Sequence, residues 1–224
     1  SLAKLSVLAL QHSDLMGDPP SVIGELKSIV TLGLHYHSTI PAWVIKMTNL
    51  TALTLVNNGH ENPVPAGLSN LKKLRLLNIA HSKLTGVFPE WLTSLQELVN
   101  VDLSGNALSG TLPTNTSKLT NLSKLILAEN FLSGTVPSLA GLTSLIWLDL
   151  QKNRFSGTLP SSLGELTSLS WNLLLSYNRF SGSLPPSLGK LTKLGTLELR
   201  NNYFTGTKRG LTVSLHACTL YQQQ

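Results

Sequence analysis

Residues 98–113 read LVNVDLSGNALSGTLP, and this pattern returns along nearly the whole chain. Its defining positions are Leu98, Val101, Leu103, Asn106, Leu108, Gly110, Leu112 and Pro113. Further copies start at Leu122 and Leu145, with apolar residues, asparagine, glycine and proline at closely matching offsets. Self-similarity with a period of roughly 20–50 residues is typical of repeat architectures. The chain is therefore predicted to be a stack of equivalent turns.

The asparagine of the repeat sets the phase of nine turns. The residues in this slot follow one another at intervals of 21 to 25 residues, mostly 24, and are Ser13, His37, Asn58, Ser82, Asn106, Asn130, Asn153, Asn178 and Asn202. We expect residues 1–207 to form one solenoid, irregular over residues 1–70 and regular over residues 71–207. Residues 208–224, where the pattern ends, are expected to form a C-terminal cap and tail.

Each residue type of the repeat has a structural role. The alternating apolar residues Leu98, Val101 and Leu103 predict a short strand with one buried side, and stacked turns would join such strands into a parallel sheet. The asparagine is expected to bind backbone groups that the following bend leaves unpaired. The glycine and proline support tight turns on the return segment. The predicted fold class is a β-rich α/β repeat solenoid with about nine repeats of 24 residues.

Three later turns share a further motif, which reads LSGTVP at 132–137, FSGTLP at 155–160 and FSGSLP at 180–185. These segments resemble the L-x-G-x-I-P consensus of the plant-specific leucine-rich-repeat family, and the resemblance extends over roughly residues 2–207. It implies a right-handed, horseshoe-shaped solenoid whose concave parallel sheet binds a ligand, as in receptor-like kinase and receptor-like protein ectodomains and in polygalacturonase-inhibiting proteins. Family members usually carry cysteine pairs in caps at both ends, whereas this chain has Cys218 alone.

Composition excludes several other classes of protein. Hydrophobic residues make up 42% of the chain and charged residues 12%, which suits one folded domain. The net charge of +6 is spread without basic blocks, so nucleic acid is not an expected partner. No apolar run is long enough for a membrane segment. Catalytic and metal-binding motifs are absent, so we expect no enzyme activity, catalytic residue, metal or cofactor.

The residues between the buried leucines of each strand are expected to face solvent on the concave sheet. The candidate ligand-binding residues, from the fifth turn onward, are Asn100, Asp102, Lys124, Glu129, Trp147, Asp149, Lys152, Trp171, Tyr177, Glu198 and Arg200. Strands about 4.8 Å apart would extend nine turns over roughly 40 Å. Such a face suits a peptide, a glycan or the edge of a protein.

Trp147 is the leading candidate, because a large amphipathic ring at an exposed sheet position is costly unless something covers it. The eighth turn carries one extra residue near Trp171. A bulge after Trp171 would place the two indoles on adjacent strands as an aromatic platform. The alternative is that the rings pack only on each other or on aliphatic stems.

Three Asn-x-Ser/Thr sequons, at Asn49, Asn115 and Asn121, predict N-glycosylation. Together with the family resemblance they indicate an extracellular location, at the cell wall or the cell surface. The alternative is that the repeat itself brings polar residues to these positions.

Hydroxyl residues recur at one position of successive turns, namely Thr111, Thr135, Thr158, Ser183 and Thr207. A regular array of hydroxyls is what a flat ice-binding surface uses, and the plant repeat family includes antifreeze members. The alternative is that the repeat consensus itself supplies the neighbouring serine and glycine.

Three functions are consistent with these patterns. The first is receptor-like recognition of a peptide or protein on the concave face, centred on Trp147, Asp149, Lys152 and Tyr177. The second is inhibition of a secreted cell-wall hydrolase, the partner that the polygalacturonase-inhibiting relatives imply. The third is ice binding through the hydroxyl ladder.

Overall fold

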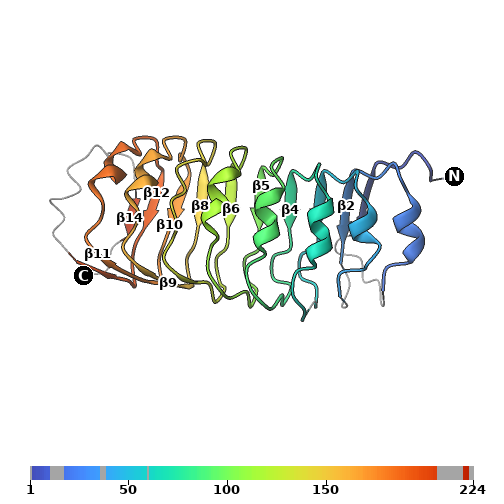
Figure 1. Cartoon of the computed structure of the whole chain (residues 1–224), viewed down its shortest axis with the longest axis horizontal. Helices are drawn as coiled ribbons and strands as arrows, with labels where there is room; N and C mark the ends of the chain where they lie inside the picture. Colours follow the sequence, from blue (N-terminus) through green and yellow to red (C-terminus); the bar gives the residue numbers. More distant parts are fainter. Residues whose placement is uncertain (1, 11–17, 36–38, 60, 206–218, 222–224) are drawn as a thin grey trace.

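The computed structural model describes residues 2–10, 18–35, 39–59, 61–205 and 219–221. The turns follow one another along the long axis of an elongated molecule, from the N-terminal to the C-terminal repeats (Figure 1). Strands lie on one side of each turn, and short helices lie on the return side (Figure 1). The predicted solenoid with a parallel sheet is confirmed.

Ten described strands form one parallel sheet, in which neighbouring strands come from successive turns. They are β1 (Val7–Leu10), β2 (Thr31–Leu34), β3 (Ala52–Thr54), β4 (Leu76–Asn78), β5 (Asn100–Asp102), β6 (Lys124–Ile126), β8 (Trp147–Asp149), β10 (Asn172–Leu174), β12 (Thr196–Glu198) and β14 (Thr219–Tyr221). The middle residues of β5, β6, β8 and β10 are Val101, Leu125, Leu148 and Leu173, which pair in register. All four are buried, so the side chains on either side of them in each strand point to the opposite, solvent-facing side.

A second parallel sheet runs along the flank of the regular turns. Its described strands are β7 (Ser133–Gly134), β9 (Arg154–Gly157), β11 (Arg179–Gly182) and β13 (Tyr203–Phe204). The sequence predicted only tight turns here. The short strands form because the backbone of each return segment meets the same segment of the next turn and exchanges hydrogen bonds with it.

Seven short 3-10 helices occupy the return side of the described turns. They are η1 (Ser21–Glu25), η2 (Val44–Lys46), η3 (Ala66–Asn70), η4 (Glu90–Ser94), η5 (Thr114–Lys118), η6 (Ser161–Glu165) and η7 (Pro186–Lys190). Six of them follow a proline, whose fixed φ suits the entry into a helical turn. The return segment between Asn130 and Asn153 is one residue shorter than the usual repeat and contains no assigned helix.

The core is a column of leucines closed at the flank by stacked phenylalanines. The rings of Phe155 and Phe180 stack with their centroids 6.1 Å apart, and those of Phe180 and Phe204 with theirs 6.0 Å apart. Phe155 and Phe180 are fully buried. Apolar burial between neighbouring turns therefore holds the stack together, as expected for a solenoid.

The asparagine slot links each turn to the one before it. Asn130 donates from Nδ2 to the carbonyl of Leu103 (2.9 Å) and accepts from the backbone N–H of Leu108 (3.0 Å), both in the preceding turn. Ser82 fills the same slot and donates from Oγ to the carbonyl of Leu55 (2.7 Å). The predicted bonding role of the slot is thus confirmed there. Ser13 and His37 lie outside the described residues.

The expected cap over residues 208–224 lies largely outside the described residues. Within that range, β14 pairs with β12 and adds a tenth strand to the sheet. No described helix is long and apolar enough to cross a membrane.

Candidate functional site

The solvent-facing side of the ten-stranded sheet, here called the sheet face, carries its side chains in rows that run across the strands. The pairing aligns Asp102 with Ile126, Ile126 with Asp149, Asp149 with Leu174, and Leu174 with Glu198. A parallel row aligns Asn100, Lys124, Trp147 and Asn172. Six predicted residues therefore share this face, on strands β5 to β12: Asn100, Asp102, Lys124, Trp147, Asp149 and Glu198.

Trp147, Trp171 and Lys124 form one cluster on the sheet face. The two indole centroids lie 6.0 Å apart, with the ring planes at 55°. Nζ of Lys124 lies 4.5 Å from the centroid of Trp171 and 5.5 Å from that of Trp147. An ammonium this close to aromatic rings is attracted by their electron-rich faces. The two indoles do lie together, and they pack on each other as well.

The extra residue of the eighth turn makes this contact possible. Asn172, not Trp171, is the register partner of Trp147, and the backbone N–H of Trp171 donates to the carbonyl of Ile146 (3.0 Å). The irregularity therefore lies at Trp171, immediately before β10. Trp171 remains 49% exposed, whereas Nε1 of Trp147 is buried and has no hydrogen-bond partner among the described residues.

Asp149 is a buried carboxylate at the centre of the sheet face, only 4% exposed. Burial raises its pKa to about 6, against the opposing effect of hydrogen bonds from the backbone N–H and the side-chain amide of Gln151. The negative charges of Asp102 and Glu198, each two strands away in the same row, raise the pKa further. Asp149 is therefore a group whose charge responds to mildly acidic pH.

Hydrogen bonds within the chain account for part of the role of these acidic residues. Asp102 accepts from the backbone N–H (3.0 Å) and Oγ (2.6 Å) of Ser104, two positions later. Asn78 accepts from the backbone N–H of Ala80 in the same way. Side chains at this row position therefore stabilise the bend after the strand, whether or not they carry a charge.

Glu129, Lys152 and Tyr177 lie on the bend beyond the strand ends, not on the sheet. Each directly precedes the asparagine slot and has a left-handed backbone, with φ of 57°, 51° and 57°. Lys152 and Glu129 form an exposed ion pair. The hydrogen bond between them raises the pKa of Lys152 and lowers that of Glu129. Lys152 thus lies beyond the strand ends with its charge paired, and its predicted contact with a ligand stays a prediction.

Arg200 and Tyr177 lie on the same bend at the ninth and eighth turns. The guanidinium carbon of Arg200 is 5.3 Å from the centroid of the Tyr177 ring, and both side chains are exposed. These two residues extend the sheet face towards the flank that carries the second sheet.

The sequons lie at the start or end of the return segments. Asn49 and Asn121 are exposed, and Nδ2 of Asn121 donates to the carbonyl of Gln96 in the preceding turn (3.0 Å). Asn115 lies in η5, and its Oδ1 is buried without a hydrogen-bond partner in the part of the chain that the structure describes. Asn49 and Asn121 are thus more exposed than Asn115, and the predicted glycosylation stays a prediction.

The hydroxyl ladder runs along the flank beside the second sheet. Its described members Thr111, Thr135, Thr158 and Ser183 are all exposed, while Thr207 lies outside the described residues. A Cβ added to Gly157 would lie 2.9 Å from the methyl carbon of Thr135. The same close approach joins Gly134 to Thr111 and Gly182 to Thr158. The threonine methyls therefore pack against the next turn.

The described residues contain no group of three His, Cys, Asp or Glu side chains that could hold a metal ion. Within the same residues, the sheet face offers aromatic rings, cations, a buried acid and amides, which are groups that recognise a ligand.

Comparison with known proteins agrees with this architecture. The sequence profile described as Leucine rich repeat matches residues 48–108, and a second profile of that description matches residues 144–166 and 171–191. The chain is a leucine-rich-repeat protein. No curated protein matches the chain.

Solved structures of plant receptors share the fold of this leucine-rich-repeat chain. The ectodomain of the Arabidopsis thaliana membrane receptor kinase GASSHO1/SCHENGEN3, in complex with CASPARIAN STRIP INTEGRITY FACTOR 2, is 31% identical with a TM-score of 0.92 over 96% of this chain and 26% of that chain. The plant peptide hormone receptor RGFR1, in complex with RGF2, is 33% identical with a TM-score of 0.86 over 99% of this chain and 37% of that chain. This chain thus spans 26–37% of these two receptor chains.

A plant ice-binding protein is also similar, at 23% identity and a TM-score of 0.66 over 92% of this chain and 80% of that chain. At this identity the similarity establishes the fold alone.

Proposed function

We propose that this chain is a receptor-like recognition module of the plant L-x-G-x-I-P subclass, which binds a peptide or protein on the sheet face of turns five to nine. It acts outside the cell and without catalysis or a cofactor. The similar receptor structures, both complexes and one of them of a plant peptide hormone receptor, support this proposal. The observation that carries it is the cluster of Trp147, Trp171 and Lys124.

The chemistry of this cluster fits a peptide. The exposed half of Trp171 offers an apolar surface for a ligand side chain. The ammonium of Lys124 offers a positive charge beside it, and the row of Asp102, Asp149 and Glu198 offers negative charge two residues further along the strands. A peptide carries apolar, cationic and anionic groups in one chain, whereas ice carries none of these charges.

Trp171 is the sharper position to test, because Trp147 is more deeply packed and its replacement would disturb the sheet. Random 12-residue peptides displayed on phage would be selected on the wild-type protein and then measured on Trp171→Ala. Truncation of an anchoring tryptophan costs about 2 kcal/mol, or roughly thirty-fold in affinity. Tyr203→Ala is the matched control, since it removes an exposed aromatic ring away from the sheet face.

The selected peptides should lose affinity on Trp171→Ala and keep it on Tyr203→Ala, with circular dichroism unchanged for both. Peptides that bind both variants as tightly as the wild type would contradict the proposed site.

Ice binding is a second candidate, favoured by the exposed hydroxyls at matching positions of successive turns. Replacing Thr111, Thr135 and Thr158 by lysine should abolish inhibition of ice recrystallisation if this ladder contacts ice. Equal behaviour of the variant and the wild type would remove this function. The packing of the threonine methyls against the next turn weighs against it. No observation on the molecule favours a secreted hydrolase as a partner.

A further inference from the structure

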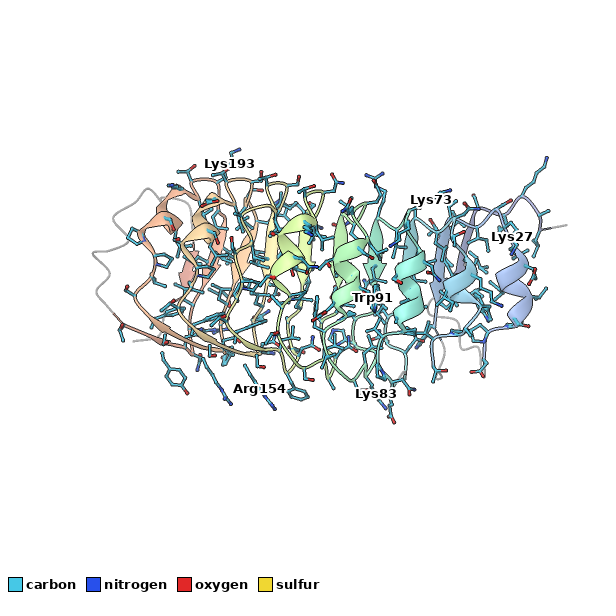
Figure 2. All side chains as sticks on the ribbon, in the orientation of Figure 1. Lys27, Lys73, Lys83, Trp91, Arg154 and Lys193 are labelled. Atoms are coloured by element: carbon cyan, nitrogen blue, oxygen red, sulfur yellow. The ribbon has the colours of Figure 1, made fainter. Side chains whose placement is uncertain are left out.

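Four consecutive turns place exposed arginine and aromatic side chains in one column, directly after the asparagine slot. The members of this arginine-aromatic column are Phe131, Arg154, Arg179 and Tyr203. Arg154, Arg179 and Tyr203 are the first residues of β9, β11 and β13. The column is staggered across the second sheet, since Arg154 pairs with Ser133, Arg179 with Ser156 and Tyr203 with Ser181. Figure 2 shows Arg154 on the opposite edge of the molecule from Lys193.

The two arginines of the column have no carboxylate partner among the described residues. The nearby acid Glu129 pairs with Lys152. The guanidinium carbon of Arg154 lies 4.5 Å from the centroid of the Phe131 ring. Stacking of this kind covers one face of the guanidinium and leaves its in-plane N–H donors free for a bidentate anion.

Exposed hydroxyls lie beside the column on the second sheet. Thr135, Thr158 and Ser183 are exposed in successive turns, four residues after Phe131, Arg154 and Arg179. Ser133, Ser156 and Ser181, two residues after Phe131, Arg154 and Arg179, also carry hydroxyls. Residues 131–135, 154–158 and 179–183 contain no carboxylate. The flank therefore combines cations, flat apolar rings and hydroxyl groups.

We propose that this flank binds an acidic polysaccharide. Its carboxylates bind Arg154 and Arg179, its sugar rings stack on Phe131 and Tyr203, and its hydroxyls bind the exposed threonines. This surface is separate from the sheet face and adds a second ligand to the proposed function.

The combination of groups on the flank favours a polysaccharide over an acidic peptide. Each unit of a uronic acid polymer brings a carboxylate, hydroxyls and an apolar ring face together, which matches the three groups on the flank. A run of acidic amino acids brings the carboxylates alone.

The test measures binding of a ten-unit oligogalacturonate by isothermal titration calorimetry. Arg154→Gln with Arg179→Gln should weaken binding at least tenfold, because two charge-assisted bidentate contacts are lost. The matched control is Lys190→Gln with Lys193→Gln, which removes the same charge from exposed positions. This control should change the affinity by less than about twofold. The methyl-esterified oligomer, which lacks the charge, should not bind.

Two further arms separate specific contacts from charge alone. Arg154→Lys with Arg179→Lys keeps the charge but loses the planar fork, and should still weaken binding several-fold. Trp171→Ala should leave oligogalacturonate binding unchanged, so a failure of the peptide site can be distinguished from a failure of the polysaccharide site. The proposal would be overturned if Lys190→Gln with Lys193→Gln weakened binding as much as Arg154→Gln with Arg179→Gln. Equally tight binding of poly-L-glutamate of the same charge would also overturn it.

Discussion

Replacing Asn178 by alanine tests the bonds that join neighbouring turns. Asn178 occupies the slot of the eighth turn and is 7% exposed. Its Oδ1 accepts from the backbone N–H of Phe155 (3.0 Å), and its Nδ2 donates to the carbonyls of Leu150 (2.8 Å) and Leu175 (3.2 Å). Phe155 and Leu150 belong to the seventh turn. One side chain thus holds the backbones of two turns.

The expected loss of stability follows from the backbone groups that lose the Asn178 side chain as their hydrogen-bond partner. The N–H of Phe155 would be buried without a partner, at a cost of about 1–3 kcal/mol. The carbonyl of Leu150 would keep only the longer bond from Asn153 (3.2 Å), so its loss is closer to that of an ordinary hydrogen bond, about 0.5–1.5 kcal/mol. Together these terms lower the free energy of unfolding by about 1.5–4.5 kcal/mol.

Urea denaturation followed by circular dichroism measures this change. The midpoint should fall while the m-value stays constant, since the folded turns bury the same surface. Asn62→Ala is the control, because Asn62 is exposed and lies outside the slot, and it should alter stability by less than about 0.5 kcal/mol. A loss below about 1 kcal/mol for Asn178→Ala would refute the view that the asparagine ladder ties the turns together.

Three further changes test the packing and electrostatics of the regular turns. The folded-state pKa of Asp149 is raised to about 6 from 3.8, so its stabilising contribution is complete below about pH 4 and is lost as pH rises through 6. At pH 7 the free energy of unfolding of Asp149→Asn should therefore exceed that of the wild type by up to about 3 kcal/mol, and at pH 4 the two should be equal. Urea denaturation at both pH values measures this difference, and an equal gain at both would contradict the prediction. Gly157→Ala should lower the free energy of unfolding by about 1–3 kcal/mol, because φ at this position is +75° and the new Cβ meets the Thr135 methyl. In a double-mutant cycle Thr135→Ser should restore only part of that loss, since it removes the methyl and leaves the backbone strain. Phe180→Ala should cost about 3–5 kcal/mol in thermal unfolding, because it removes the middle ring of the stacked phenylalanines, and a loss under 1 kcal/mol would argue against the stack.

The architecture follows from the sequence because each turn repeats a local pattern. Leu125 and Leu148 are buried partners in the sheet, as the alternation of apolar residues predicts. Asn130 bonds to the preceding turn, as its place in the repeat predicts. The second sheet was missed because its strands are two to four residues long, too short for a pattern of their own, and form only when turns stack.

The binding surfaces followed from the sequence only in part. A bulge after Trp171 was predicted to place the two indoles on adjacent strands. Trp171 instead lies immediately before β10, with Asn172 opposite Trp147, and the two indole centroids still lie 6.0 Å apart. The sequence predicted that Lys124 lies on the face, but it did not predict that its ammonium lies over both indole rings. The contact of Arg154 with Phe131 had one sequence signal, the shared position after the asparagine slot, but that signal does not show which side chains meet.

The sequence by itself determined the period, the parallel sheet and the asparagine ladder, because in a solenoid these depend on a motif that every turn carries and on contacts with the nearest turns alone. The tertiary structure alone decided that Asp149 is buried, that Lys152 is paired with Glu129, and that Arg154 and Arg179 have no carboxylate partner among the described residues. The physical reason is that burial and ion pairing depend on side chains about 24 positions apart in sequence. Their distances are set by how neighbouring turns stack, including the single extra residue at Trp171.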